Sequence, residues 1–393
     1  MLDFCWVGAG ALVTKLLAEH GADVIKVESQ ARPDNLRVAP PFRPGADGLE
    51  ASGYFASRNN DKRSLALNMR EPKGREIARE LARKCDLVTS NFRPGVMERW
   101  GLDYPTLRSD NPSLLYLSMP MNGSSGPDSS AIGFGSTIAA QAGLVYLSGR
   151  PDRAPVGTGT HYPDHVPSPG HALVAVLAAL LQRSKTGAGR MIEISQLEST
   201  VNTIGPAVVA ASAGQSPARL GNRVPGHHPS GVFPCAGDDR WIALAVRTDG
   251  EWQSVATALS PELAHDPRFL TTEGRAAAED EVERRIAELT RERDRDELAA
   301  DLQARGVPAS AVQSSEDILR DEHLRAREFW RELHHPVLGT ITMPAAPFQS
   351  RSGRTGPERA APLLGEHSRE IMTSLLGLSD AEVDTLVEEK VLW

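Results

Sequence analysis

Hydrophobic and polar positions change period repeatedly along the first 120 residues of the chain. Short apolar runs are typical of strands and occur at residues 1–7, 24–28, 65–68, 86–90 and 114–119. Between these runs, apolar residues recur every three or four positions and predict helices at 11–20, 74–84, 96–100 and 105–109. Strand and helix therefore alternate four times, which predicts an α/β fold built on a parallel sheet.

The pattern changes further along the chain. Residues 136–143 and 196–213 are each expected to form one helix, and 32–53 a long loop. A Pro- and Gly-rich linker over 214–234 is followed by a strand at 241–246 and by helical spacing of apolar residues among the charges of 277–305. We expect a large domain over 1–213, this linker, a small α/β domain over 235–312, and a linker and returning segment over 313–393.

The stretch 155–195 combines stiff prolines with one acid. Asp164 lies between Pro163 and Pro167, and a helix is expected to begin near Pro169 and to end at the glycines of 187–189. A carboxylate held beside buried helix residues loses solvent, so its pKa rises and it becomes a stronger nucleophile or base. The alternative is an ordinary loop acid or helix cap.

Glycine and arginine near the expected strand ends suggest a phosphate site. Gly8 and Gly10 stand between the first strand and its helix, where backbone N–H groups can approach a phosphate. The third glycine of the dinucleotide pattern is missing, although Glu28 closes the second strand as in dinucleotide-binding folds. Arg37 is open to two interpretations, a phosphate contact or a solvated side chain.

Composition excludes several classes. The net charge of −8 over 393 residues, with no basic block, argues against a nucleic-acid partner. The longest apolar runs, such as 172–181, fall far short of the roughly 20 residues of a membrane span. Cys5, Cys85 and Cys235 are widely spaced, so we expect neither a disulfide framework nor a metal site. With no basic signal-peptide region at Met1, a cytoplasmic location is expected.

Several ordered segments carry a resemblance to a known family. The segments are LDFCWVGAGALVTKLLAEHGADVIKVES, RNNDKRSLALNMREPKGRE, NFRPGVMERWGLDY, PDH with GHALVAVLAAL, TGAGR and IEIS, and PLLGEHS. Together they resemble the class III CoA-transferases of the carnitine, bile-acid and formyl-CoA transferase type over nearly the whole chain. The resemblance implies a Rossmann-like large domain, a small α/β domain, and two chains interlocked as rings in a homodimer.

The family's chemistry assigns a role to Asp164. By resemblance, its carboxylate attacks an acyl-CoA thioester and forms a mixed anhydride, and the released CoA thiolate then forms an aspartyl-CoA thioester. An acceptor acid attacks this thioester, and the thiolate finally takes the new acyl group. The resemblance thus implies coenzyme A as part of an acyl-CoA substrate, a small carboxylic acid as second substrate, and no tightly bound cofactor. Succinyl-CoA is one candidate donor, and the acceptor stays open.

The resemblance also implies contacts to CoA. It assigns Val7, Gly8 and Ala9 to the first turn, and Leu67, Asn68, Met69 and Arg70 to the segment that holds the adenine and phosphate end of CoA. It assigns Asn91, Phe92 and Arg93 to the pantetheine path, and Arg99 to a phosphate. The chain departs from the family at four positions. Ala11 stands in place of a proline, and Asn68 in place of an aspartate. Ser29 replaces an arginine or proline, and Gly135 replaces an acid.

Two other functions stay open. The related α-methylacyl-CoA racemases use a histidine in a Gly-His-Asp run as a second base, and this chain has Gly133-Phe134-Gly135 instead. His161 or His165 would have to replace that histidine, because racemisation needs two placed bases. The other alternative is a non-catalytic CoA-binding protein.

Overall fold

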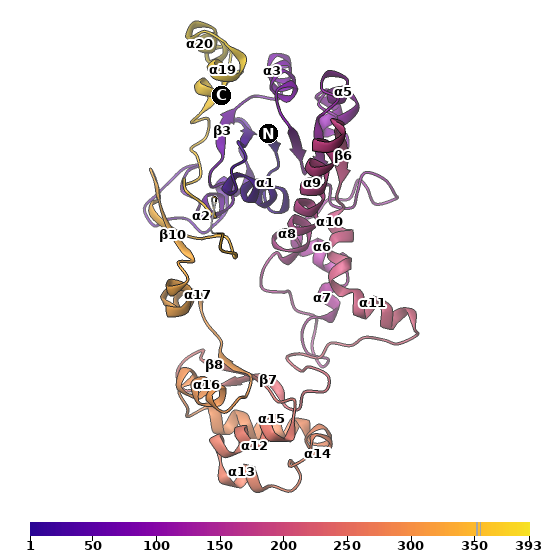
Figure 1. The fold of residues 1–393 in the computed structure, drawn as a ribbon, viewed down its shortest axis with the longest axis vertical. Helices are drawn as coiled ribbons and strands as arrows, with labels where there is room; N and C mark the ends of the chain where they lie inside the picture. The colour runs from indigo at the N-terminus through magenta and orange to yellow at the C-terminus, as the bar shows by residue number, and fades with distance from the viewer. Residues whose placement is uncertain (351–352, 354) are drawn as a thin grey trace. The chain divides into compact units, whose positions relative to one another are not determined.

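The computed structural model describes residues 1–350, 353 and 355–393, which form two compact units (Figure 1). The large unit comprises Met1–Val145, Gly157–Gln215 and His323–Trp393. The small unit comprises Tyr146–Val156 and Ser216–Glu322. Each unit has its own hydrophobic core.

The large unit is built on one parallel sheet. Its six strands have the order β3-β2-β1-β4-β5-β6, and every neighbouring pair is parallel. They are β1 (Leu2–Phe4), β2 (Ile25–Glu28), β3 (Arg63–Ala66), β4 (Leu87–Ser90), β5 (Leu115–Ser118) and β6 (Arg190–Glu193). The parallel sheet that the alternating pattern predicts is confirmed. The strand order reverses between β1 and β4, which in open α/β sheets is where ligands bind.

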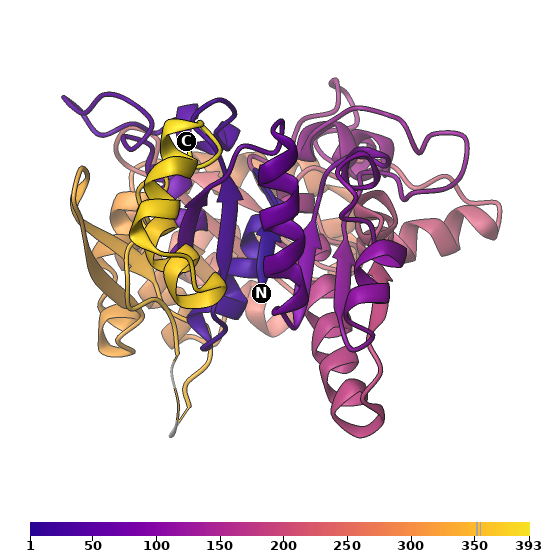
Figure 2. The same ribbon diagram turned by 90° about the horizontal axis from the view of Figure 1, so that it is seen from above.

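Alternate residues of the strands point to opposite faces and bury two different sets of helices. Val88 and Tyr116 belong to the core that packs on α3 (Pro72–Arg83), α5 (Tyr104–Asp110), α19 (Ser368–Leu376) and α20 (Asp380–Glu388). Leu87, Leu115 and Leu117 belong to the other core, under α1 (Ala9–Glu19) and α9 (Pro167–Thr186). Figure 2 shows α3 and the C-terminal helices together beside the sheet.

The C-terminal segment of the chain joins the sheet edge at β3. The backbone N–H of His367 donates to the carbonyl of Ser64 at 3.1 Å, and the N–H of Asn68 donates to the carbonyl of Val391 at 2.9 Å. The large unit also contains the hairpin of β10 (Trp330–His335) and β11 (Gly339–Pro344). Its remaining helices are η1 (Asn35–Val38), α2 (Gly53–Arg58), α4 (Val96–Arg99), α6 (Gly135–Gln141), α8 (Tyr162–His165), α10 (Gln196–Val201), η2 (Asn202–Ile204) and α11 (Gly205–Ser212).

The prediction of a single helix over 196–213 is wrong. The segment consists of α10, the short 3-10 turn η2 and α11, because Pro206 has no N–H to continue a helical ladder and is placed in the first turn of α11. The loop expected over 32–53 likewise contains η1, whose first turn is capped by the side chain of Asp34. Asp164 lies in the short helix α8 and not in a loop, and α9 begins at Pro167.

The small unit packs helices on an antiparallel sheet. Its strands are β7 (Ser230–Pro234), β8 (Trp241–Ala245) and β9 (Ala309–Ala311), in that order. The charged stretch 277–305 buries Ile286, Leu298 and Leu302, so its charges form the solvated face that helical spacing predicts. Its helices are α12 (Asp249–Leu259), α13 (Pro261–His265), α14 (Thr272–Ala277), α15 (Glu279–Thr290), α16 (Arg295–Ala304) and α17 (Ser315–Arg320). The helices α7 (Leu144–Leu147) and α18 (Glu322–Ala326) lie at the boundaries of the units.

Candidate active site

The loop after β1 is fixed at the point where the strand order reverses. Asn91, directly after β4, accepts a hydrogen bond from the N–H of Trp6 at 2.9 Å and donates to the carbonyl of Trp6 at 2.6 Å. Asp34 accepts from the N–H of Val7 at 3.1 Å and pairs with the buried Lys26 at 2.8 Å. Val7 has a φ of 64°, an uncommon conformation for a β-branched residue, so the fold holds this turn in a strained form.

Asp164 faces this turn from α8. The residue is 8% exposed, and burial raises the pKa of its carboxyl to about 6, against smaller opposing effects of His161, the backbone N–H of Gly135 and Arg58. Two glycines make room for it. A β-carbon at Gly8 would stand 2.7 Å from the β-carbon of Asp164, and one at Gly135 would stand 2.4 Å from its Oδ2. The desolvated carboxyl expected from the prolines is therefore present.

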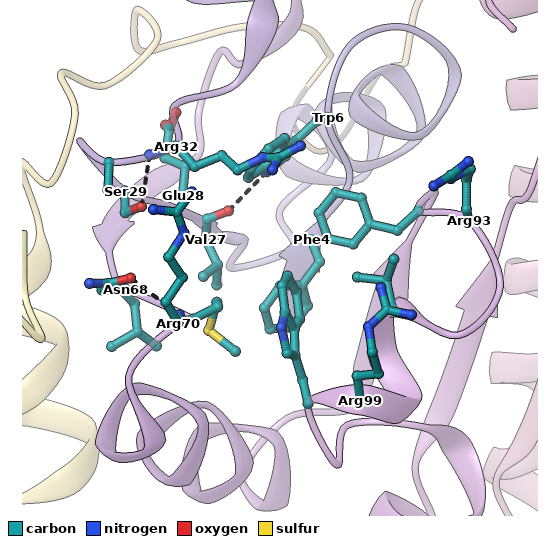
Figure 3. A pocket seen from close by; sticks show the side chains of 16 residues that line it. Phe4, Trp6, Val27, Glu28, Ser29, Arg32, Asn68, Arg70, Arg93 and Arg99 are labelled. Atoms are coloured by element: carbon teal, nitrogen blue, oxygen red, sulfur yellow. Dashed lines mark hydrogen bonds between the residues drawn. The ribbon is translucent and has the colours of Figure 1, made fainter. Parts of the chain in front are cut away.

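A cavity of about 500 Å³, which we call the arginine pocket, opens beside β1 and β2 (Figure 3). Arg32 and Arg70 lie on one side of it and Arg93 and Arg99 on the other. None of these arginines has an ion pair among the residues that the structure describes, so the pocket presents unneutralised positive charge. The remaining lining residues are Phe4, Trp6, Val27, Glu28, Ser29, Ala31, Leu67, Asn68, Met69, Phe92, Val96 and Trp100.

A second cavity of about 280 Å³, the aspartate pocket, contains Asp164. Trp6, Phe92 and Arg93 line both pockets, so the two cavities adjoin along these side chains. The ring of Phe92 contacts that of Trp6 edge-on, with centroids 5.1 Å apart. The other lining residues of the aspartate pocket include Val7, Gly8, Ala9, Asn35, Asn91, Pro94, Met121, Ser129, Phe134, Ile138 and Gln196. Together the pockets lead from an arginine-lined cavity to the buried carboxyl.

The structure brings together every residue for which the sequence predicts a contact to CoA. Val7, Gly8, Ala9 and Asn91 line the aspartate pocket. Phe92 and Arg93 line both pockets. The residues in the arginine pocket alone are Leu67, Asn68, Met69, Arg70 and Arg99.

Two departures from the family pattern acquire a structural explanation. The Nδ2 of Asn68 donates to the carbonyl of Lys390 at 3.2 Å, a bond for which an ionised aspartate has no donor. Ser29 accepts a hydrogen bond from the N–H of Arg32 at 3.2 Å and closes a tight turn. This turn places Arg32 in the arginine pocket, a lining residue that sequence reasoning missed because only the turn brings it there.

Both interpretations of Arg37 are wrong, and so is the dinucleotide interpretation of Glu28. Arg37 is fully buried, donates to Glu28 at 2.8 Å and also pairs with Glu50. Its guanidinium stacks 3.7 Å from the centre of the Phe55 ring. Since Glu28 is engaged by Arg37 and by the N–H of Asp34, its carboxylate is not free to bind a ribose.

The histidines beside Asp164 are poor candidates for a second base. Burial, with smaller effects of Arg58 and His161, lowers the pKa of His165 to about 4, so the ring is neutral. Its Nδ1 lies 3.2 Å from Nη2 of Arg58 and accepts a hydrogen bond from that guanidinium. His161 is exposed to solvent. No cluster of three His, Cys, Asp or Glu side chains that could hold a metal ion occurs in the described part of the chain.

Comparison with known proteins agrees with this geometry. The sequence profile of CoA-transferase family III matches residues 1–368. The chain belongs to CoA-transferase family III. Members of this family are enzymes that transfer CoA, and the chain is therefore an enzyme of this class.

Relatives in the family differ in length and in substrate. The chain is 35% identical to a probable CoA-transferase of Mycobacterium tuberculosis over 100% of its own length, and it spans 50% of that protein. It is 32% identical to the succinyl-CoA–D-citramalate CoA-transferase of Chloroflexus aurantiacus, covering 98% of this chain and 94% of the relative. It is 34% identical to the succinyl-CoA:mesaconate CoA-transferase of Haloarcula marismortui, with coverage of 98% and 96%.

A solved structure shows the same fold. The crystal structure of a CAIB/BAIF family protein from Brucella suis superposes with a TM-score of 0.87 at 30% identity, covering 95% of this chain and 97% of that one. Among the described residues of this family III chain, no helix has the length and apolar character needed to cross a bilayer. Cys5, Cys85 and Cys235 are free and buried.

Proposed function

We propose that this chain transfers CoA from an acyl-CoA donor to a carboxylic acid acceptor, with Asp164 as the nucleophile. The observation that carries the proposal is a buried carboxyl of raised pKa at the inner end of two adjoining pockets whose outer part is lined by unpaired arginines. Guanidinium groups suit the phosphates of CoA, because they donate paired hydrogen bonds. An acyl-CoA bound in this way directs its thioester toward Asp164.

The desolvated carboxylate of Asp164 is the attacking group in the first step and the leaving group in the last step. Its oxygen adds to the thioester carbonyl, the C–S bond breaks, and the products are a mixed anhydride and CoA thiolate. The thiolate then attacks the aspartyl carbonyl and releases the donor acid, which leaves CoA on Asp164. The acceptor carboxylate and the thiolate repeat the two steps in reverse order, so one hard exchange becomes several easier ones.

The glycines around Asp164 support this role. Because no side chain stands at positions 8 and 135, nothing crowds Oδ2 of Asp164 where added β-carbons would stand 2.8 Å and 2.4 Å from it, and Asp164 lines the aspartate pocket. The N–H of Gly135 donates to the carboxylate and fixes its orientation. Orientation of this kind contributes strongly to the rate, since reacting atoms must approach along a defined line.

The experiment that tests the proposal is trapping of the intermediate. The protein is incubated with succinyl-CoA or with another acyl-CoA and digested, and the peptide that contains Asp164 is analysed by mass spectrometry. We expect a CoA thioester on Asp164 that hydroxylamine removes, and no such adduct in Asp164→Ala. Absence of an adduct with every donor, together with exchange of the α-proton of a 2-methylacyl-CoA, would favour a racemase.

The same proposal includes the assembly expected from the family. We place CoA binding in a large domain over 1–213 and 313–393, joined through the linker 214–234 to a small domain over 235–312, in an interlocked cytoplasmic homodimer. A band of exposed apolar side chains on α9 supports a second copy as partner. Val174, Leu177 and Leu181 lie on one side of this helix and are 70%, 51% and 67% exposed.

A further inference from the structure

Arg58 is a partly buried cation whose strongest partners are uncharged. Its Nη2 donates to the neutral His165 at 3.2 Å, and its guanidinium lies 5.5 Å from the centre of the Tyr54 ring. Its Nε is buried and has no hydrogen-bond partner. Among the residues placed by the structure, no carboxylate forms an ion pair with Arg58. Burial lowers the pKa of this guanidinium, and the Tyr54 and Asp164 side chains oppose that effect.

The other buried cations that the structure describes in the large unit are paired. Lys26 lies 2.8 Å from Asp34, and Lys62 lies 3.1 Å from Asp3. Arg37 also has a carboxylate, 2.8 Å away. A buried cation without a counter-charge lowers stability, so such residues are retained where a ligand supplies the charge. Arg58 is therefore a candidate site for an anion.

The position of Arg58 shows where that anion would lie. Its partners Tyr54 and His165 line a cavity of about 490 Å³, the tyrosine pocket, which is also formed by Pro40, Pro41, Ser136, Ala139, Val145, Gly157, Thr158, Gly159, Thr160 and His161. Ser136 follows the glycine that touches Asp164, and His165 follows Asp164 itself. His161, which lines the tyrosine pocket, lies against the same glycine, Gly135, as Asp164 does. The pocket is therefore close to Asp164, and Arg58 and Asp164 interact electrostatically.

We propose that Arg58 binds the non-reacting carboxylate of a short dicarboxylic substrate in the tyrosine pocket while the other end of that substrate reacts at Asp164. This proposal rests on the proposed function of the site. Since Nε is enclosed by protein, the Nη groups of Arg58 are the donors that a substrate carboxylate would reach, and this edge of the guanidinium matches a carboxylate. The neutral His165 holds the fork in place without competing for the anion, because it accepts a hydrogen bond from Arg58 and carries no negative charge.

The test compares two donors that differ only at the far end of the acyl chain. Succinyl-CoA ends in a carboxylate, whereas butyryl-CoA ends in a methyl group. The rate of formation of the Asp164-CoA thioester is measured in single turnovers with the parent enzyme, Arg58→Gln and Arg58→Lys. For each donor, the rate constant is divided by the half-saturating concentration of that donor, and the value for succinyl-CoA is then divided by the value for butyryl-CoA. We expect this ratio to fall about 50-fold in Arg58→Gln, a typical loss for a charged hydrogen bond.

The ratio separates binding of the carboxylate from general damage. A structural defect, or a change in the pKa of Asp164, slows both donors alike and leaves the ratio unchanged, and that result would overturn the proposal. Arg58→Lys keeps the charge without the fork, so it should give an intermediate ratio. Should Arg58→Gln fail to fold, a parent enzyme that reacts faster with butyryl-CoA than with succinyl-CoA also overturns the proposal. Failure of the proposed function gives a different result, no thioester on Asp164 from either donor.

Discussion

Gly135 lies against Asp164 so closely that a β-carbon at position 135 would stand 2.4 Å from Oδ2 of the aspartate. The approach also places the backbone N–H of Gly135 where it donates to the carboxylate. The resemblance to the family leads to an acid being expected at this position, but in this chain a longer side chain would displace the carboxylate of Asp164. Gly135 is thus part of the packing that orients Asp164.

Replacing Gly135 by alanine should therefore disable the nucleophile. The added methyl forces the carboxylate to turn or shift, and a displacement of about 1 Å can lower a rate about 100-fold. We expect Gly135→Ala to form the Asp164-CoA thioester at least about 100 times more slowly, as measured by quenched-flow mass spectrometry. Gly170→Ala in α9 is the matched control, since no atom lies within 4 Å of its added carbon. Equal rates in the two variants would show that the contact does not orient Asp164.

Protonation of Asp164 should govern the pH dependence of the first half-reaction. In the proposed mechanism the carboxyl attacks only when ionised, and its pKa in the folded protein is about 6. We expect the rate of thioester formation to rise with pH through about 6 and to level off above it. A profile that is flat between pH 5 and 7 would assign the attacking group to another residue, provided that the substrate itself does not titrate in this range.

The same raised pKa makes Asp164 costly for stability at neutral pH. Between the unfolded value of 3.8 and the folded value of about 6, the folded protein binds more protons than the unfolded chain, so stability falls as the pH rises. The full effect of about two pKa units corresponds to about 3 kcal/mol. We expect Asp164→Asn to be inactive but to unfold at a higher urea concentration than the parent at pH 7.5. The difference should disappear near pH 4, where the parent carboxyl is protonated in the folded state.

Arg70 and Arg99 should act on the phosphates of CoA and not on the acyl group. We expect Arg70→Ala and Arg99→Ala each to raise the KM for acyl-CoA at least about tenfold, because a charge-assisted hydrogen bond is lost. The same substitutions should have little effect on the corresponding acyl-pantetheine, which has no nucleotide phosphate. Arg108→Ala serves as the control, since this arginine is exposed and lies outside both pockets. Equal losses with both thioesters would contradict a phosphate contact.

Asp34 holds the loop that follows β1 and should be important for stability. It neutralises the buried Lys26 and accepts the N–H of Val7. Its removal leaves an unpaired buried cation, so we expect Asp34→Ala to lower the free energy of unfolding by about 3–5 kcal/mol in urea titration. Asp47→Ala, at an exposed position later in the same segment, should change it by less than about 0.5 kcal/mol. Similar losses in both variants would contradict this role of the Lys26 pair.

The sequence predicts those features of the fold that depend on neighbouring residues. Alternating apolar runs predict the parallel sheet, and the two prolines around Asp164 predict a desolvated carboxyl. Contacts between distant positions are not predictable in this way. Arg58 reaches His165 across 107 residues, and Arg37 is neutralised by Glu28 only because η1 folds back onto β2. The meaning of Gly135 depends on the same kind of contact, because only the fold brings it to Asp164.

The exposed face of α9 should be covered by a second copy of the chain. The side chains of Val174, Leu177 and Leu181 form an apolar band that is exposed to solvent. Such a band is rare on a helix of a stable monomer. We expect the parent protein to be a dimer by light scattering after gel filtration and Leu181→Glu to weaken or abolish the dimer, since the substitution buries a charge in the interface. Val387→Glu, at a 48% exposed position of α20, is the matched control and should leave the dimer intact. A parent protein that remains monomeric at micromolar concentration would show that this face does not join two copies.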